Sequence, residues 1–246
     1  MSYLDIHSHL IPGIDDGCED FDQALESVIR LREAGYVGTV CTPHIWPELF
    51  PGNTPAHVQG LTLHLQRELR NRGVSYRLWP GGELRLFKGA VKWMKQHGVP
   101  TLAGSRCVLC DLWEDRWPKH ADQTLDWLLD EGYTPILAHP ERVNISEDAI
   151  EADLERITGK GVLLQGNFNC LTGQDGPLAA QRIRRWLRDD RYALMALDMH
   201  RPHVLGTRLE GLDVLRREFT DDHVEALTAA APRELLGLKT EADDGG

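Results

Sequence analysis

The most visible chemistry in the sequence is a pair of histidines, His7 and His9, which follow an apolar run near the start of the chain. Residues i and i+2 of an extended segment point to the same side, so both imidazoles can bind one metal ion. The loop PGIDDG follows and supplies Asp16, a carboxylate ligand in the same stretch. The stretch IDDG contains Asp-Gly, a good turn signal, so Asp15 is expected only to shape the loop and Asp16 is the better candidate for a ligand.

Further residues of ligand type end other predicted strands. Asp198 and His200, in the stretch LDMH, repeat the spacing of the first pair. Others follow apolar runs singly: His44, Glu83, Asp111, His139 and Asn167. Imidazole with carboxylate suits zinc, manganese or iron, and a set of this size can hold two or three ions bridged by carboxylates. Either pair alone could arise by chance, but the two pairs together with the other strand ends predict a metal centre.

Short apolar runs alternate with longer amphipathic runs along the chain. The short runs predict strands at 3–7, 37–42, 76–82, 107–112, 134–138, 162–166 and 193–198. The amphipathic runs predict helices at 20–34, 55–72, 87–97, 120–131, 147–159, 177–189, 207–218 and 221–229. Asp20 is expected to cap the first helix. Strands that are each followed by a helix predict an α/β fold with a parallel sheet.

Length and repeat count favour one closed barrel over an open, doubly wound sheet. The 246 residues contain no linker or repeat, so residues 1–246 are read as a single domain, with a disordered polar tail at 240–246. In a parallel barrel, the C-terminal ends of the strands converge on one face, where active sites lie. The predicted strand ends therefore bring the ligand-type residues together.

Charge and cysteine content exclude several classes of protein. The net charge of −11 argues against sequence-independent binding of nucleic acid, which needs basic residues to neutralise phosphates. It also argues against binding to anionic membranes, and no apolar run is long enough to span one. The five cysteines are scattered and odd in number, which is not a disulfide framework. Without a recognisable signal peptide, the sequence predicts a cytoplasmic protein.

Five segments, in this order, resemble the polymerase and histidinol phosphatase (PHP) superfamily, and more closely its bacterial tyrosine phosphatases of the CpsB/YwqE type. The segments read DIHSHLIPGIDDG, TPH, GGEL, LAHPER and LDMH, and they span residues 5–200. The resemblance implies a distorted (β/α)7 TIM-like barrel with two or three divalent ions, manganese first, with iron, zinc or cobalt as alternatives. Carried over by position, the ligands would be His7, His9, Asp16, His44, Glu83, Asp111, His139, Asp198 and His200.

The resemblance also implies an activity, the hydrolysis of phosphotyrosine in protein. A hydroxide that bridges the ions would attack phosphorus, while Arg142 of the segment HPER would hold the phosphate. Asp198 counts among the catalytic residues, and His44 or His139 would protonate the leaving oxygen, although phenolate can leave without a proton. The implied substrate is the tail of a tyrosine autokinase that controls capsule or exopolysaccharide synthesis. The oligomeric state stays open.

Position 111 departs from the family pattern, which has glutamate where this chain has Asp111. Aspartate is one methylene shorter, so bridging two ions would need a closer strand end or a weaker ion. Glu114 is an alternative that could reach in from the following loop. Relatives also place a second phosphate-binding arginine after the last motif, and here Arg201 and Arg208 are both candidates.

Other functions fit less well. Cys110 and Arg116 match the Cys-x5-Arg spacing of cysteine-dependent tyrosine phosphatases, but acidic residues between them would repel both thiolate and phosphate. Cys107 and Cys110 are expected to point to opposite faces of a strand as core residues. The remaining alternatives are a histidinol phosphatase, a metal-dependent nuclease, which the charge disfavours, and a non-catalytic metal-binding module.

Overall fold

The structure is a computed structural model that describes residues 2–238, so the predicted tail at 240–246 lies outside the described residues. Its strands form two parallel sheets. One sheet has the order β1 (Tyr3–Ser8), β2 (Tyr36–Cys41) and β4 (Arg77–Pro80). The other has the order β3 (His44–Ile45), β5 (Glu83–Arg85), β6 (Cys107–Asp111), β7 (Thr134–Ala138), β8 (Leu163–Asn167) and β9 (Leu194–Ala196).

The two sheets continue one another through two breaks that the sequence did not reveal. The predicted strand 37–42 is β2, which β3 extends after Pro43, a residue that cannot donate to a strand ladder. The predicted strand 76–82 is wrong at its end, because β4 stops before Gly81 and β5 starts after Gly82. A Cβ at either glycine would lie 2.7 Å from the side chain of Val40 or Ile45, so only glycine fits this bend. Seven strand positions result, as expected.

The first and last strand positions meet at the C-terminal edge of the sheet. Ser8 pairs with Met199 in a parallel bridge, and the N–H of His9 donates to the carbonyl oxygen of Met199 at 2.7 Å. Nearer the start of β1, Asp5 Oδ1 accepts the N–H of Leu197 at 3.0 Å. These contacts join β1 to the chain after β9, which gives the distorted barrel order that the sequence predicted.

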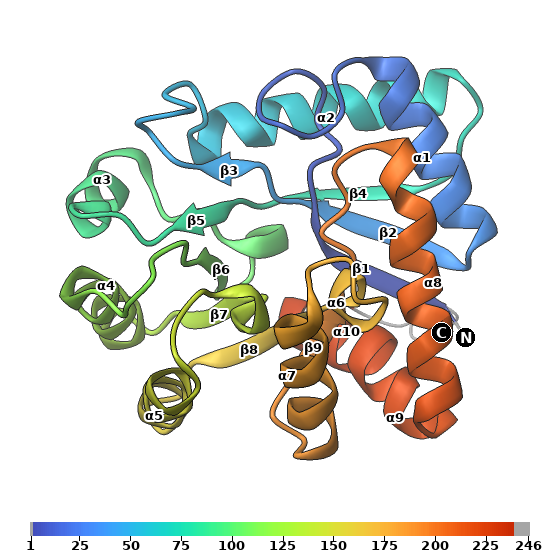
Figure 1. Ribbon diagram of the computed structural model, residues 1–246. Helices are drawn as coiled ribbons and strands as arrows, with labels where there is room; N and C mark the ends of the chain where they lie inside the picture. The colour runs from blue at the N-terminus through green and yellow to red at the C-terminus, as the bar shows by residue number, and fades with distance from the viewer. Residues whose placement is uncertain (1, 239–246) are drawn as a thin grey trace, which may run out of the picture.

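Helices surround the strands (Figure 1). The main ones are α1 (Phe21–Glu33), α2 (Pro55–Asn71), α3 (Ala90–His97), α4 (Lys119–Asp130), α5 (Glu147–Thr158), α7 (Pro177–Arg188) and α8 (Pro202–Glu218). Asp20 caps α1 as predicted, accepting the N–H of Gln23 at 2.9 Å. The predicted starts at 87 and 207 were wrong, because α3 begins at Ala90 and α8 begins five residues early at Pro202. No helix of residues 2–238 is long and apolar enough to cross a membrane.

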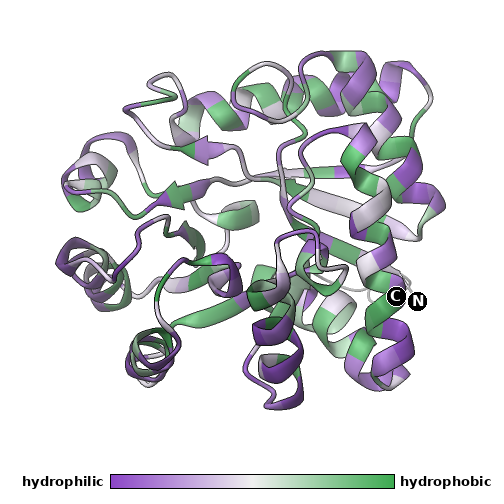
Figure 2. Cartoon of the chain, viewed as in Figure 1, coloured by the Kyte–Doolittle hydropathy of each residue, from purple (hydrophilic) through white to green (hydrophobic). Residues whose placement is uncertain are grey.

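Two apolar clusters stabilise the barrel, one on each face of the strands. The inner cluster includes Leu4, Val40, Leu109 and Ile136, together with Leu236 of the C-terminal helix α10 (Ala231–Leu236). Figure 2 shows the hydrophobic colouring on strands such as β8 and mixed colouring on the helices around them, whose inner sides build the outer cluster.

Two of the cysteines test the predicted alternation of strand faces. Cys107 belongs to the inner cluster and Cys110 to the outer one. This placement confirms that the two thiols point to opposite faces of β6 as core residues.

The contact at Asp5 gives a test of barrel closure. Replacing Asp5 with alanine leaves the N–H of Leu197 without its acceptor, which costs about 1–3 kcal/mol. Asp5→Asn keeps an acceptor oxygen and removes a buried charge, so it should be at least as stable as the wild type at pH 8. Urea unfolding of both variants measures this. Equal stability of Asp5→Ala and Asp5→Asn would contradict a closing role for this bond.

The same residue gives the protein a defined pH dependence. Burial raises the pKa of Asp5 from 3.8 to about 7. Between these values the folded chain holds a proton that the unfolded chain releases, so the contribution of Asp5 to stability falls as pH rises from 4 to 7. The difference in free energy of unfolding between Asp5→Asn and the wild type should therefore grow with pH, by at most about 1.4 kcal/mol per unit.

Candidate metal centre

All sequence-predicted ligands lie at the C-terminal edge of the barrel or in the loops just beyond it. His7 lies in β1 and His9 directly follows it, and the loop after them returns one carboxylate to the same place. Neighbouring strands bring the remaining residues to this edge in the order of the sheet. The full set is His7, His9, Asp16, His44, Glu83, Asp111, His139, Asp198 and His200.

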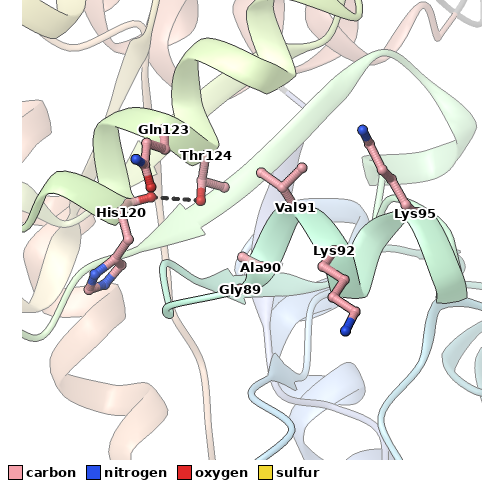
Figure 3. A pocket seen from close by; sticks show the side chains of 8 residues that line it. All are labelled: Gly89, Ala90, Val91, Lys92, Lys95, His120, Gln123 and Thr124. Carbon is pink, nitrogen blue, oxygen red and sulfur yellow. Dashed lines mark hydrogen bonds between the residues drawn. The ribbon is translucent and has the colours of Figure 1, made fainter.

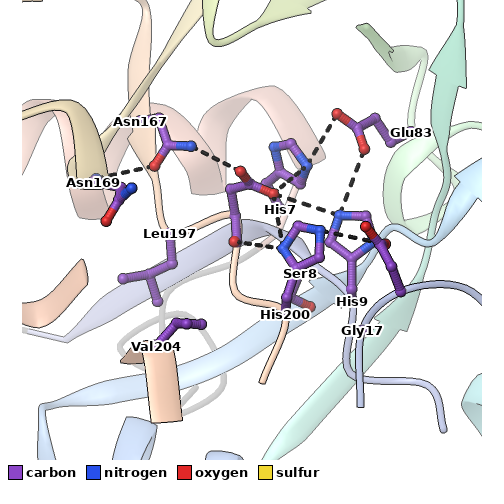
Figure 4. A network of polar contacts seen from close by, with 12 residues as sticks. His7, Ser8, His9, Gly17, Glu83, Asn167, Asn169, Leu197, His200 and Val204 are labelled. Carbon is purple, nitrogen blue, oxygen red and sulfur yellow. Dashed lines mark hydrogen bonds and ion pairs between the residues drawn. The ribbon is translucent and has the colours of Figure 1, made fainter. Parts of the chain in front are cut away.

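Eight of these residues form three overlapping groups whose ligand atoms lie within 4.8 Å of one another. The first contains His9, Asp16, His44 and His200; the second His7, His9 and Asp198; the third His7, Glu83 and His139. Figure 4 shows the rings of His7, His9 and His200 converging from one side, with the carboxylate of Glu83 facing them. Because the groups share His7 and His9, they form one continuous cluster of candidate ligands.

Glu83 lies between two of these groups. Its Oε1 is 3.3 Å from Nε2 of His7 and 3.1 Å from Nε2 of His139. Its Oε2 is 2.9 Å from Nδ1 of His44 and 3.5 Å from Nε2 of His9. Because each oxygen faces a different pair of imidazoles, Glu83 has the geometry of a bridging carboxylate.

Asp198 divides its two oxygens between the ligands and a supporting network. Its Oδ1 lies 3.4 Å from Nε2 of His7 and 3.5 Å from Nε2 of His9. Its Oδ2 accepts from Arg142 Nη1 at 2.7 Å and from Asn167 Nδ2 at 2.8 Å. Asp198 has a positive φ of 49°, a conformation that costs a non-glycine residue on the order of 1–3 kcal/mol and often marks functional sites. His139, with φ 35°, shares this strain.

Two residues that sequence reasoning missed orient the first histidines. The Nδ1–H of His7 donates to Gln165 Oε1 at 2.8 Å, and that of His9 donates to Asp15 Oδ2 at 2.7 Å. Such bonds fix the tautomer and leave Nε2 for an ion. Asp15 was expected only to shape the turn, but its side chain is fully buried and also accepts the N–H of His44 at 3.1 Å. A glutamine inside the apolar run VLLQG was the available signal for Gln165.

A close approach explains how the loop after β1 returns to the histidines. The N–H of Cys18 donates to the carbonyl oxygen of His9 at 3.0 Å. A Cβ on Gly17 would lie 2.1 Å from that same oxygen, so only glycine allows the return. The loop then places Asp16 Oδ1 3.3 Å from Nε2 of His44 and 3.4 Å from Nε2 of His200.

The charges of these residues suit cations. Burial opposes ionisation of Glu83 and Asp198, yet the neighbouring histidines hold the pKa of both carboxyls well below its usual range. Burial also disfavours a protonated His9, but Asp15 raises the pKa of His9 to about 10. Nε2 of His7 and of His9 are buried without a hydrogen-bond partner among residues 2–238. A divalent ion would take the place of the protons and satisfy these nitrogens, so the residues fit metal ions.

Asp111 lies beside the three groups and belongs to none of them. Its Oδ1 is 3.9 Å from Nδ1 of His139, and its Oδ2 is 3.9 Å from Nη1 of Arg85. Burial and the nearby charge of Glu83 raise the pKa of Asp111 to about 6. Asp111 therefore lies at the edge of the cluster, with His139 as its nearest candidate ligand. Glu114 does not replace it, because Glu114 accepts from Arg85 Nη2 at 3.0 Å.

The two candidate arginines of the last loop differ in position. Arg208 is buried, and its Nε–H donates to the carbonyl oxygen of Asp198 at 2.9 Å. Arg201 is half-buried, and it donates to the carbonyl oxygen of Asp16 and to the carboxylate of Glu19. Of the two, Arg208 is the one beside the ligand Asp198.

A separate hollow of about 360 Å³ lies between α3 and α4 (Figure 3). Its lining consists of Gly89, Ala90, Val91, Lys92, Lys95, His120, Gln123 and Thr124. The Nε2–H of His120 donates to the carbonyl oxygen of Leu86 at 3.0 Å, so this nitrogen is already used in a structural hydrogen bond. None of the nine predicted ligands lines this hollow.

The bond between Asp15 and His9 predicts a measurable loss of metal affinity. Asp15→Asn removes the charge that orients His9, and such supporting contacts are worth about 10–100-fold in affinity. Competition with a fluorescent chelator measures the affinity for manganese. Asp22→Asn, an exposed change on α1, is the matched control and should bind like the wild type. Unchanged affinity in Asp15→Asn would show that the orienting bond is not needed.

Comparison with known proteins places the chain in a family. A family model described as "Capsular polysaccharide synthesis, CpsB/CapC" matches residues 3–237. Tyrosine-protein phosphatase YwqE of Bacillus subtilis (strain 168) is 27% identical over 234 residues, which cover 95% of this chain and 91% of the relative. Tyrosine-protein phosphatase CpsB of Streptococcus agalactiae serotype V is 25% identical over 243 residues, which cover 95% and 98%.

Solved structures agree with this placement. A crystal structure from work on YwqE of Bacillus subtilis and CpsB of Streptococcus pneumoniae, described there as metal-dependent tyrosine phosphatases, matches with a TM-score of 0.85. It is 26% identical, and the match covers 96% of this chain and 95% of that one. The phosphotriesterase homology protein of Escherichia coli, 12% identical with a TM-score of 0.56, shares the fold over 96% and 98% of the two chains. Taken with the model match over residues 3–237, these similarities show that the chain belongs to the CpsB/CapC family of capsular polysaccharide synthesis proteins.

Proposed function

We propose that this protein is a metal-dependent protein-tyrosine phosphatase. The observation that carries the proposal is the set of three overlapping ligand groups at the mouth of the barrel, with a potential bridging carboxylate, Glu83, between them. The relatives named tyrosine-protein phosphatases cover nearly the whole chain, which supports the same activity.

Two or three divalent ions are proposed to bind to the nine predicted ligands, with manganese first and iron, zinc or cobalt as alternatives. Bound there, the ions would supply a nucleophile from water at neutral pH and neutralise the charge of the phosphoryl oxygens. Four of the nine ligands are carboxylates, whose combined charge would balance two divalent ions: Asp16, Glu83, Asp111 and Asp198.

Arg142 is proposed to bind the phosphate. Its Nη1 is fixed by Asp198 at 2.7 Å, while one third of the side chain stays exposed. Its Nε lies 3.8 Å from Asp175. A planar guanidinium matches two phosphate oxygens, so the exposed part of Arg142 can receive a phosphoryl group at the rim of the ligand cluster. We assign the second basic position to Arg208 rather than Arg201, because Arg208 is the one bonded to the Asp198 backbone.

His44 and His139 remain the proposed proton donors to the leaving oxygen. The side chain of His44 is 11% exposed and that of His139 is 6% exposed, and this favours His44. Burial disfavours the charged ring of His44, but Glu83 and Asp16 raise its pKa to about 11, so a proton is retained there wherever no ion replaces it. Phenolate is a good leaving group, so this proton contributes less for phosphotyrosine than for an alkyl phosphate.

The family description, capsular polysaccharide synthesis, supports a substrate in that process. We propose the phosphotyrosine-bearing tail of a tyrosine autokinase that controls capsule or exopolysaccharide synthesis. All five cysteines are free and buried, as suits a reducing compartment, and we place the reaction in the cytoplasm.

A cysteine-dependent mechanism has no support in the geometry. The Cys110 side chain is completely buried in the outer apolar cluster, where no substrate can reach it. Burial and the neighbouring charges of Asp111 and Glu83 raise its pKa, so no thiolate is available.

Hydrolysis of two substrates with and without a chelator tests the proposal. The protein should release phosphate from a phosphotyrosine peptide, lose this activity with a strict chelator, regain it with manganese, and keep it after alkylation with iodoacetamide. Histidinol phosphate should be hydrolysed at least about tenfold less efficiently, since its leaving group is an alkoxide that needs a proton donor. Preference for histidinol phosphate would favour the small-molecule phosphatase instead. No turnover of either substrate by metal-loaded protein would favour a non-catalytic metal-binding module.

A further inference from the structure

A second layer of side chains stands directly above the ligands on three adjacent strand positions. Figure 1 shows β3, β5 and β6 next to one another, and their pairing is parallel. Two residues beyond the predicted ligand of each strand, on the side facing the mouth, come Trp46, Arg85 and Trp113. Arg85 is the last residue of β5, Trp46 directly follows β3, and Trp113 lies two residues after β6, so all three come just after the candidate ligands of these strands.

Trp46 contacts both of the other side chains. The guanidinium carbon of Arg85 lies 5.1 Å from the ring centroid of Trp46. The rings of Trp46 and Trp113 have centroids 6.3 Å apart and are tilted by 57°. Arg85 is buried and reaches down to Asp111 at 3.9 Å, which connects the aromatic pair to the ligand layer. The pair is therefore held in place beside the ions' proposed position.

Part of this layer is exposed to solvent and can contact a bound molecule. Trp113 is 59% exposed, which is unusual for so large an apolar side chain, and Leu49 of the neighbouring loop is 52% exposed. In the same loop Phe50 stacks on the predicted ligand His44, with centroids 5.8 Å apart and planes 10° apart. Aromatic side chains therefore lie on one side of the mouth, from Phe50 beside the candidate ligand His44 to the exposed Trp113.

We infer that Trp46 and Trp113 form a subsite for the phenyl ring of phosphotyrosine, with Arg85 positioning Trp46 from below. The inference rests on the proposed function, and it explains why the phosphatase would prefer phosphotyrosine to phosphoserine. A phosphate placed at the ligand cluster puts the attached ring at the height of this layer, where tilted aromatic contacts are favourable. Phosphoserine has no ring to fill the subsite.

Substitution of the exposed tryptophan tests the subsite. Trp113→Ala should raise KM for a phosphotyrosine peptide roughly 3- to 10-fold and leave kcat within about twofold, because ring contacts act mainly on binding. Trp113→Phe keeps a ring and should restore KM. Leu63→Ala, a change of an equally exposed apolar residue on α2, is the control and should match the wild type.

A binding measurement separates this inference from the proposed function. Calorimetry on manganese-loaded protein compares phenylphosphonate with methylphosphonate, neither of which is hydrolysed. The wild type should bind the phenyl compound more tightly, and Trp113→Ala should bring the ratio of affinities close to one. An unchanged ratio in Trp113→Ala, or a ratio near one in the wild type, overturns the subsite. Failure to hydrolyse phosphotyrosine while the ratio behaves as expected would overturn the proposed reaction instead.

Discussion

Two carboxylates, Glu83 and Asp198, are buried among histidines at the C-terminal mouth of the barrel, and most of the site depends on how their charge is neutralised. A buried charge without a partner is costly, so such groups are paired or coordinate metals. Here the partners are imidazoles whose Nε2 atoms face the same space as the carboxylate oxygens, while Arg142 compensates only one edge of Asp198. The cluster is consequently built for cations, and a phosphoryl group can approach only because those cations reverse the local field.

The barrel gives up regular geometry to maintain this cluster. Its strands break beside Pro43 and at the paired glycines 81–82, which lets His44 and Glu83 start new short strands facing the mouth. His139 and Asp198 adopt left-handed backbone conformations, which are uncommon for residues other than glycine. Strain of this kind persists where the surrounding structure fixes it. Here the N–H of His139 donates to the carbonyl oxygen of Gln165, and the carbonyl oxygen of Asp198 accepts from Arg208.

The sequence predicted the parts of the molecule that follow from periodicity and spacing. His7 and His9 could be placed on one side of a strand end, and the barrel order followed from alternating runs. Contacts made across the barrel could not be predicted: Gln165 reaches His7 from a strand 158 residues away, and nothing in its spacing indicates the pairing. Asp15 was underestimated for a similar reason, since only the close return of the loop at Gly17 brings it to His9.

The most direct test of the central idea is to count metal ions in the purified protein while following hydrolysis of a phosphotyrosine peptide. Metal-free protein is titrated with manganese, and bound metal is measured by mass spectrometry beside the rate. Activity should appear only as more than one ion binds per chain, and Glu83→Gln, which loses the charge between the groups, should bind fewer ions and lose most activity. Full activity in chains that hold no metal, or full metal binding and activity in Glu83→Gln, would contradict metal-dependent catalysis at this cluster.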